Sequence, residues 1–231
     1  MKSTIRSFFA VVVLAVVFAA PAVAGPSLLC HAFDIGDGKS LPWISPSWNL
    51  DGSESYNTTR LPADTLSILD NDSTVLVHME TLRRAALYGQ KDPVALKQLV
   101  LRLLARSEAA GASSPSAGLS AFDLGYFAET LAQAQWINKG GANPAQGLDG
   151  RALVKKALQL RGRDPQMEFA AALITLNGPT SEQQECAKRA IAGAKSDPLL
   201  ARNLASHFMS PQSELMSEMI ARSSTTKVAH Q

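Results

Sequence analysis

Cysteine and histidine are the residues of this chain that could carry metal or nucleophilic chemistry, and both are scarce. The sequence has two cysteines and four histidines. His31 directly follows Cys30, but covalent haem attachment needs a C-x-x-C-H sequence, and no second cysteine precedes His31 at that spacing. A zinc site needs several ligands at short spacing, whereas the remaining histidines are scattered. They are His78, His207 and His230. The sequence therefore predicts no metal ligand and no cofactor.

A cysteine hydrolase would pair one of the two cysteines with a histidine distant in sequence. Cys30 has no recognisable nucleophile context, and Cys186 lies in the middle of a predicted helix. We therefore expect no catalytic residue.

The N-terminal segment has the composition of a secretory signal peptide. Lys2 and Arg6 form a basic region, and 8–20 is an apolar run too short to span a bilayer, which takes about 20 residues. The small-x-small sequence at 22–24 predicts cleavage after Ala24. No later segment is long, apolar and uncharged, so we expect no membrane span after cleavage. These features predict a protein of the bacterial envelope, either periplasmic or secreted.

Export would place both cysteines in an oxidising compartment, where an even number of cysteines favours a disulfide. A bond between Cys30 and Cys186 would tie the N-terminal part of the chain to a C-terminal helix. The alternative is two thiols, one of them buried in that helix. The sequence leaves both alternatives open.

The charge of the chain argues against one class of partner. The formal net charge is +2, and removal of Lys2 and Arg6 would bring it to zero. A neutral chain without a basic tract is not typical of a nucleic-acid-binding protein.

Composition and periodicity predict an all-α fold. Hydrophobic residues make up 46% of the chain and aromatic residues only 6%, and alanine, the best helix former, is abundant. After the signal peptide we expect an irregular N-terminal arm at 25–60, a helical repeat domain at 61–222 and a flexible tail at 223–231. The predicted helices cover 61–70, 74–88, 93–110, 120–138, 148–160, 165–176, 181–194, 198–208 and 212–222.

A fourteen-residue sequence motif, which we call the phrase, occurs three times and predicts how these helices are joined. The copies are ETLRRAALYGQKDP from Glu80, ALVKKALQLRGRDP from Ala152 and ECAKRAIAGAKSDP from Glu185. Each has a basic pair and an alanine, and closes on Asp-Pro seven residues after that alanine. Asp-Pro is suited to cap and start a helix, so each copy predicts a corner between two helices. We expect the basic pairs to lie on solvated helix faces.

The second and third copies are 33 residues apart, the length of a two-helix repeat. This spacing, with small residues in the second helix and a closing proline, resembles tetratricopeptide repeats. The segment 165–198 carries the resemblance, with Cys186 and Gly193 near the small positions, although Ala170 and Asn177 stand near the positions where tryptophan and tyrosine are expected. The resemblance implies antiparallel hairpins stacked as a tetratricopeptide-like superhelix.

A second resemblance is to uncharacterised exported bacterial proteins. It rests on Cys30-His31, on the segment Lys39-Ser40-Leu41-Pro42-Trp43, and on the segment Met79-Glu80-Thr81-Leu82-Arg83-Arg84-Ala85. This resemblance implies no particular activity.

Two functions are the main alternatives for this sequence, and a structural subunit that is stable only within an oligomer is a third possibility. The first is a scaffold without catalysis of its own that binds a protein or peptide, because stacked hairpins present an extended concave surface. The alternative is a small-ligand carrier or an enzyme with a pocket between the N-terminal arm and the helices. Trp43, Trp48 and His78 are the candidate ligand contacts of that pocket.

Overall fold

The structure is a computed structural model, and it describes residues 26–44, 50, 52–72, 74–110, 115–176 and 180–207. The predicted signal peptide at 1–24, Trp48, the predicted helix at 212–222 and the tail at 223–231 lie outside the described residues.

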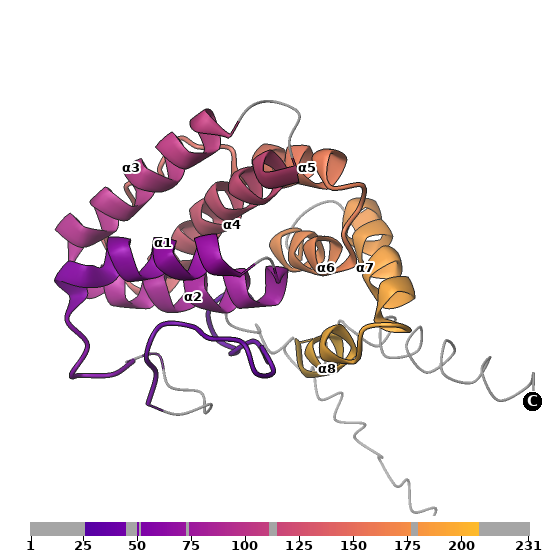
Figure 1. The fold of residues 1–231 in the computed structure, drawn as a ribbon, viewed down its shortest axis with the longest axis horizontal. Helices are drawn as coiled ribbons and strands as arrows, with labels where there is room; N and C mark the ends of the chain where they lie inside the picture. Colours follow the sequence, from indigo (N-terminus) through magenta and orange to yellow (C-terminus); the bar gives the residue numbers. More distant parts are fainter. Residues whose placement is uncertain are drawn as a thin grey trace, which may run out of the picture.

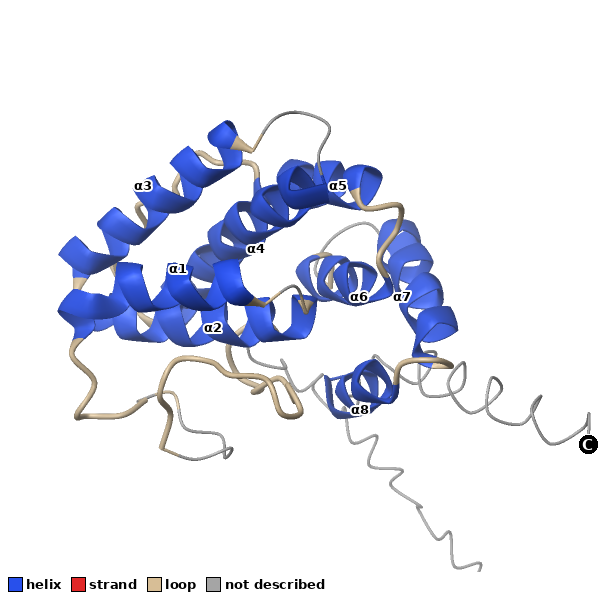
Figure 2. Cartoon of the chain, in the orientation of Figure 1, coloured by secondary structure: helices blue, strands red, loops and turns tan. Residues whose placement is uncertain are grey.

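The described residues are all-α, as predicted, and contain no strand (Figures 1 and 2). A short 3-10 helix, η1 (Thr58–Arg60), precedes eight α-helices. These are α1 (Leu61–Asn71), α2 (Val75–Lys91), α3 (Pro93–Ala109), α4 (Pro115–Ile137), α5 (Gly150–Leu160), α6 (Pro165–Ile174), α7 (Thr180–Ala194) and α8 (Pro198–His207). None of them is long and apolar enough to cross a membrane.

Glycines bring two of the helix pairs into close antiparallel contact. Gly125 of α4 lies against Gly150 at the start of α5, where an added Cβ would come within 2.7 Å of the Gly150 carbonyl oxygen. Gly193 near the end of α7 lies against Pro165 at the start of α6, and its Cβ would come within 2.2 Å of a proline carbon. Because Gly125 and Gly193 have no side chain, the helices of α4–α5 and of α6–α7 can approach closely. These are the most extensively packed helix pairs.

The three copies of the phrase form helix corners, which confirms that prediction. Each closing aspartate is an N-cap whose carboxylate accepts a backbone N–H in the next helix, and each proline is the first residue of that helix. The capping pairs are Asp92 Oδ1 with Ala95 N, Asp164 Oδ1 with Gln166 N, and Asp197 Oδ1 with Leu200 N, all at 3.0 Å. The shared alanines Ala85, Ala157 and Ala190 are completely buried.

Helix α4 begins earlier than the sequence predicts. It starts at Pro115, whereas the run of small residues there predicts a loop through Gly118. Gly118 lies inside the helix and faces the end of α5, where an added Cβ would come within 2.6 Å of Arg161 Cγ. The small residue at this position therefore serves helix packing rather than a turn.

The described residues of the N-terminal arm form no regular helix before η1, as predicted, and they pack on the helices (Figure 1). Its apolar side chains are buried in the common core; they are Leu28, Leu29, Phe33 and Leu41. Ser27 donates a hydrogen bond to the Leu173 carbonyl of α6 at 3.1 Å, and Asp34 exchanges backbone hydrogen bonds with the Asn203 amide of α8. The arm thus joins the N-terminal and C-terminal helices.

Candidate functional site

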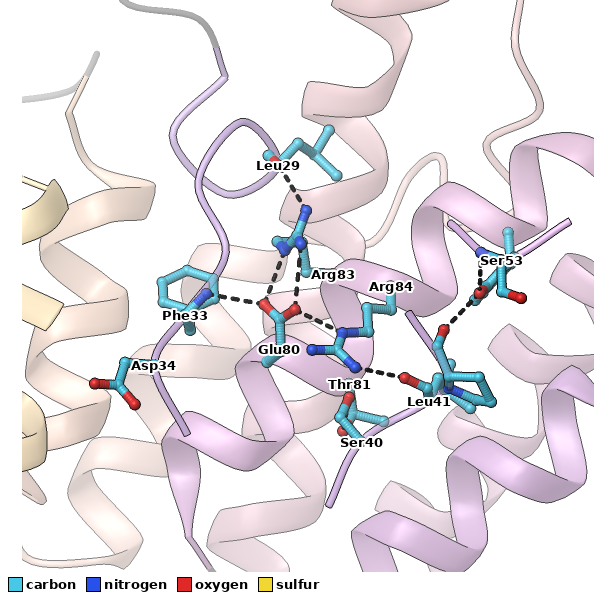
Figure 3. Close-up of polar contacts among 12 residues, drawn as sticks. Leu29, Phe33, Asp34, Ser40, Leu41, Ser53, Glu80, Thr81, Arg83 and Arg84 are labelled. Atoms are coloured by element: carbon cyan, nitrogen blue, oxygen red, sulfur yellow. Dashed lines mark hydrogen bonds and ion pairs between the residues drawn. The ribbon is translucent and has the colours of Figure 1, made fainter. Parts of the chain in front are cut away.

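A buried carboxylate on α2 holds the N-terminal arm (Figure 3). Glu80 is completely buried, and its Oε2 accepts the backbone N–H of Phe33 at 2.9 Å. Arg83 donates to both oxygens of Glu80 and uses Nη1 to donate to the Leu29 carbonyl at 2.9 Å. Arg84 donates to Glu80 Oε1 at 2.6 Å. Because these charges compensate each other, their burial is tolerated.

The same arginines enclose Trp43 of the arm. The Arg83 and Arg84 guanidinium carbons lie 5.1 Å and 5.7 Å from the centre of its ring, within cation–π range. The Tyr88 ring contacts Trp43 edge to face, with ring centres 5.6 Å apart. Arg84 also donates to the Leu41 carbonyl. Trp43 therefore packs the arm against α2.

The expectation that the basic pairs are solvated is wrong for the first copy of the phrase. Arg83 is buried, whereas Lys155 and Lys156 of the second copy are exposed, as expected. Glu80 pairs with Arg83 and Arg84 on the same side of α2, and the N-terminal arm covers this cluster, because Glu80 accepts from the Phe33 N–H and Arg83 donates to the Leu29 carbonyl. Glu185 precedes Lys188 and Arg189 at the same spacing in the third copy, but Glu185 and Lys188 are exposed.

His78 belongs to a second buried polar network. Its Nδ1 lies 2.6 Å from Asp123 Oδ1, and its Nε2 lies 2.8 Å from the Asp72 carbonyl oxygen. Arg106 forms an ion pair with the other oxygen of Asp123 and with Asp70 at 3.0 Å. Burial alone would lower the pKa of His78, but the charge and hydrogen bond of Asp123 outweigh burial and raise it.

The candidate ligand contacts predicted from the sequence do not form one site. His78 has zero exposure and both ring nitrogens are occupied, so it has no free atom for a ligand or for proton transfer. Trp43 packs on α2 through Arg83 and Arg84. Neither residue lines any of the three cavities described next. Among the described residues, Trp43 and His78 are therefore engaged by other side chains of the chain.

In two of the cavities, one prominent polar side chain of the lining is already paired. One, of about 640 Å³, lies beside Arg106, which is held by Asp70 and Asp123. Another, of about 440 Å³, lies beside Gln166, whose amide donates to Asp197 Oδ2 at 2.7 Å and accepts from the Leu76 N–H.

The third cavity is a groove of about 220 Å³ between α5, α6 and α7, which we call the α5–α7 groove. Its apolar lining comes from all three helices: Val154, Leu158, Ala171, Ile174 and Cys186. Its polar lining is Arg151, Lys155, Gln159, Arg163, Glu168, Thr175, Glu182, Glu185 and Arg189. Residues of the second and third copies of the phrase line the groove, so its shape depends on the corner that joins α5 and α6.

An incompletely paired carboxylate lies at the base of this groove. Glu168 of α6 is 1% exposed, and its Oε1 accepts a hydrogen bond from Arg189 Nε of α7 at 2.6 Å. Its Oε2 is buried and accepts no hydrogen bond from the described residues. An unsatisfied buried acceptor is unusual in a folded protein. The sequence hint is a single carboxylate within an apolar run, Met167-Glu168-Phe169-Ala170.

The rim of the groove is charged asymmetrically. Arg151 and Lys155 of α5 and Arg163 of the following corner are exposed and form no ion pair with described residues. On the α7 side, Glu185 pairs with Lys188 at 3.0 Å, and exposed Glu182 forms no ion pair with described residues. The α5 side therefore presents unpaired positive charge to the groove.

Both cysteines are free thiols in the structure, so the disulfide between Cys30 and Cys186 is not formed there. Cys186 is buried, and burial together with the charge of Glu168 and a hydrogen bond to the Glu168 carboxylate raises the pKa of the Cys186 thiol to about 11. Burial also raises the pKa of half-buried Cys30. A thiol that stays protonated at neutral pH is a poor nucleophile.

The chemistry available in the α5–α7 groove is binding. It offers an apolar surface, a buried hydrogen-bond acceptor and a cationic rim, while its thiol is protonated at neutral pH. The described residues contain no cluster of three or more histidine, cysteine or acidic side chains able to hold a metal ion.

Comparison with models of protein families, with curated proteins and with solved structures finds no match for this chain.

Proposed function

We propose that this chain is an exported, tetratricopeptide-like helical scaffold that binds a protein or peptide segment and has no catalysis of its own. The observation that carries the proposal is the α5–α7 groove, which combines an apolar floor, a buried carboxylate oxygen without a hydrogen bond and a charged rim. Such a combination suits a side chain of a bound peptide. Peptide recognition in grooves between helices depends on such apolar anchors with polar surroundings. The bacterial envelope is the proposed location, because the sequence at 1–24 has the features of a signal peptide.

Binding is tested with a displayed library of random peptides selected on the chain from Gly25 onward. Selected peptides are then measured against Leu158→Arg, which places a charge in the groove, and against Leu101→Arg. Leu101 is 54% exposed on α3 and does not line the groove, so it is the matched control. We expect Leu158→Arg to abolish binding and Leu101→Arg to preserve it. Equal binding by both variants, or failure to select any peptide, would contradict the proposal.

Export is tested separately by expressing the full chain in a bacterium with a C-terminal tag and fractionating the cells. We expect the tagged protein in the envelope fraction, with a mature N-terminus at Gly25. A cytoplasmic protein that retains Met1 would contradict the proposed location.

A further inference from the structure

We infer that the occupant of the α5–α7 groove is a tyrosine side chain from a segment that also carries acidic residues. This inference rests on the proposed function and names the chemistry of the partner. The aromatic ring covers the apolar floor, the phenol hydroxyl donates to Glu168 Oε2, and the flanking carboxylates meet the cationic rim.

The size of the groove favours one side chain over a whole ligand. Its volume is about 220 Å³, below the roughly 300–1,000 Å³ of sites that enclose a drug-sized molecule. An aromatic ring gives the largest apolar contact area in a space of this size. Leu158, Val154 and Ile174 supply the apolar contacts.

The buried acceptor selects a side chain with a donor at its tip. Glu168 Oε2 has no hydrogen-bond partner among the described residues, and tyrosine combines an apolar ring with an O–H donor. Glu168 Oε2 is buried and is not accessible to solvent in the structure. Arg189 pairs with the other oxygen of Glu168, lines the groove and has a third of its side chain exposed. The inference requires that Arg189 or a neighbouring side chain moves to admit the hydroxyl.

The charges around Glu168 select a neutral donor rather than a cation. Arg189 already compensates the Glu168 carboxylate. A lysine or arginine from a partner would add a second cation there and would also face Arg163 and Lys155, which line the groove. A neutral hydroxyl satisfies Oε2 without that repulsion.

The rim accounts for the acidic residues of the segment. Arg151, Lys155 and Arg163 lie along one side of the groove, and no described carboxylate pairs with them within 4 Å. Carboxylates on both sides of the tyrosine would compensate these charges. Charge complementarity of this kind speeds association and makes binding weaken with salt.

The test uses a blocked peptide with one tyrosine between pairs of glutamates, its phenylalanine counterpart, and a counterpart with lysines in place of the glutamates. Titration calorimetry measures each against the chain from Gly25 onward and against Glu168→Gln. We expect the tyrosine peptide to bind about tenfold more tightly than the phenylalanine peptide, as one hydrogen bond to a carboxylate allows. Glu168→Gln should reduce this ratio to about threefold or less, and the lysine peptide should not bind.

Lys155→Glu provides a second variant that does not disturb the buried pair, because Lys155 is exposed. It should weaken the tyrosine and phenylalanine peptides equally and reduce the salt dependence of both. Equal binding of tyrosine and phenylalanine peptides to the unmodified chain would overturn the inference. Binding of p-cresol alone as tight as that of the peptide would also overturn it, in favour of a small-molecule site.

The two proposals fail in different ways. If library peptides bind in the groove but the tyrosine peptide has no advantage, the proposed function stands and the assignment of the occupant is wrong. If no library peptide depends on Leu158, both proposals fail.

Discussion

At the scale of single residues, two equally buried glutamates differ in their hydrogen bonds and therefore in their roles. Glu80 and Glu168 are both buried glutamates paired with arginine, yet both oxygens of Glu80 accept hydrogen bonds while Oε2 of Glu168 accepts none. Glu80 is therefore part of the framework, and Glu168 is the residue with an unused acceptor. His207 shows a further effect, because burial lowers its pKa to about 4 and keeps the ring neutral against Phe33.

The His78–Asp123 pair gives a prediction at this scale. In Asp123→Asn the burial of His78 and the positive charge of Arg106 remain while the attracting charge is lost, so the pKa of His78 should fall below its ordinary 6.5. Breaking a buried pair in this way should lower the free energy of unfolding by about 3 kcal/mol. NMR titration of the histidine and urea denaturation measure the two effects.

The pH dependence of stability follows from the same pair. The raised pKa of His78 in the folded protein means that its protonated form is stabilised. This contribution is fully present below pH 6.5 and is lost as the pH rises through the pKa of the folded state. In Asp123→Asn the sign reverses, so the variant should lose stability relative to the unmodified protein as the pH falls below 6.5. Parallel pH profiles of the two proteins would contradict the assignment.

At the scale of helices, contact between glycine and a facing helix sets the geometry of the hairpins. Gly193 lies in the last turns of α7, where alanine would normally stabilise a helix by about 1 kcal/mol. Its Cβ would instead come within 2.2 Å and 2.4 Å of Pro165 side-chain carbons, and the proline ring cannot rotate away. We therefore expect Gly193→Ala to reduce the free energy of unfolding by about 1–3 kcal/mol through overpacking.

Thermal denaturation of Gly193→Ala measures this effect, and Ala192→Gly is its matched control. Ala192 is exposed and adjacent in α7, so the control reports helix propensity alone and should cost about 1 kcal/mol. Stabilisation by Gly193→Ala would show that α6 and α7 are farther apart than the structure has them. Because Glu168 and Arg189 join the same two helices, this spacing also determines the base of the α5–α7 groove.

At the scale of the whole molecule, the N-terminal arm connects elements that are distant in sequence. Its residues contact α2 through Glu80 and Arg83 and contact α8 through Asp34 and Asn203. The ends of the described chain are thereby joined without a disulfide. We consider the arm a part of the fold and not an appendage, because its leucines belong to the common core.

Arg83→Met tests this role of the arm. The substitution keeps much of the apolar volume but removes the Arg83 hydrogen bonds to Glu80 and to the Leu29 carbonyl, leaving Arg84 as the remaining arginine partner of Glu80. We therefore expect the arm to open more often. Hydrogen exchange of the Phe33 amide, which donates to Glu80, should accelerate by at least about tenfold. Lys155→Met, at the equivalent position of the second copy of the phrase, is exposed and should leave that exchange rate unchanged. Unchanged exchange in Arg83→Met would show that Arg83 does not hold the arm.

The sequence by itself determined the helical class and the three Asp-Pro corners, because capping and helix propensity act within a few residues. It also placed the buried alanines Ala85, Ala157 and Ala190, whose spacing from the closing aspartate is constant. It did not determine the site. The basic pairs look alike in sequence, but only the tertiary structure decided that Arg83 is buried and Lys155 is exposed.

The reason is that the burial of a charge depends on the segment lying opposite, which comes from elsewhere in the chain. Leu29 and Phe33 of the arm lie about fifty residues before their partners on α2. Glu168 likewise meets Arg189 only because α6 and α7 fold against each other. Residue type alone suggested a pocket at Trp43 and His78, but neither residue lines the three cavities described above. Packing of α5, α6 and α7 placed the cavity with the open acceptor at the corner formed by the second copy of the phrase.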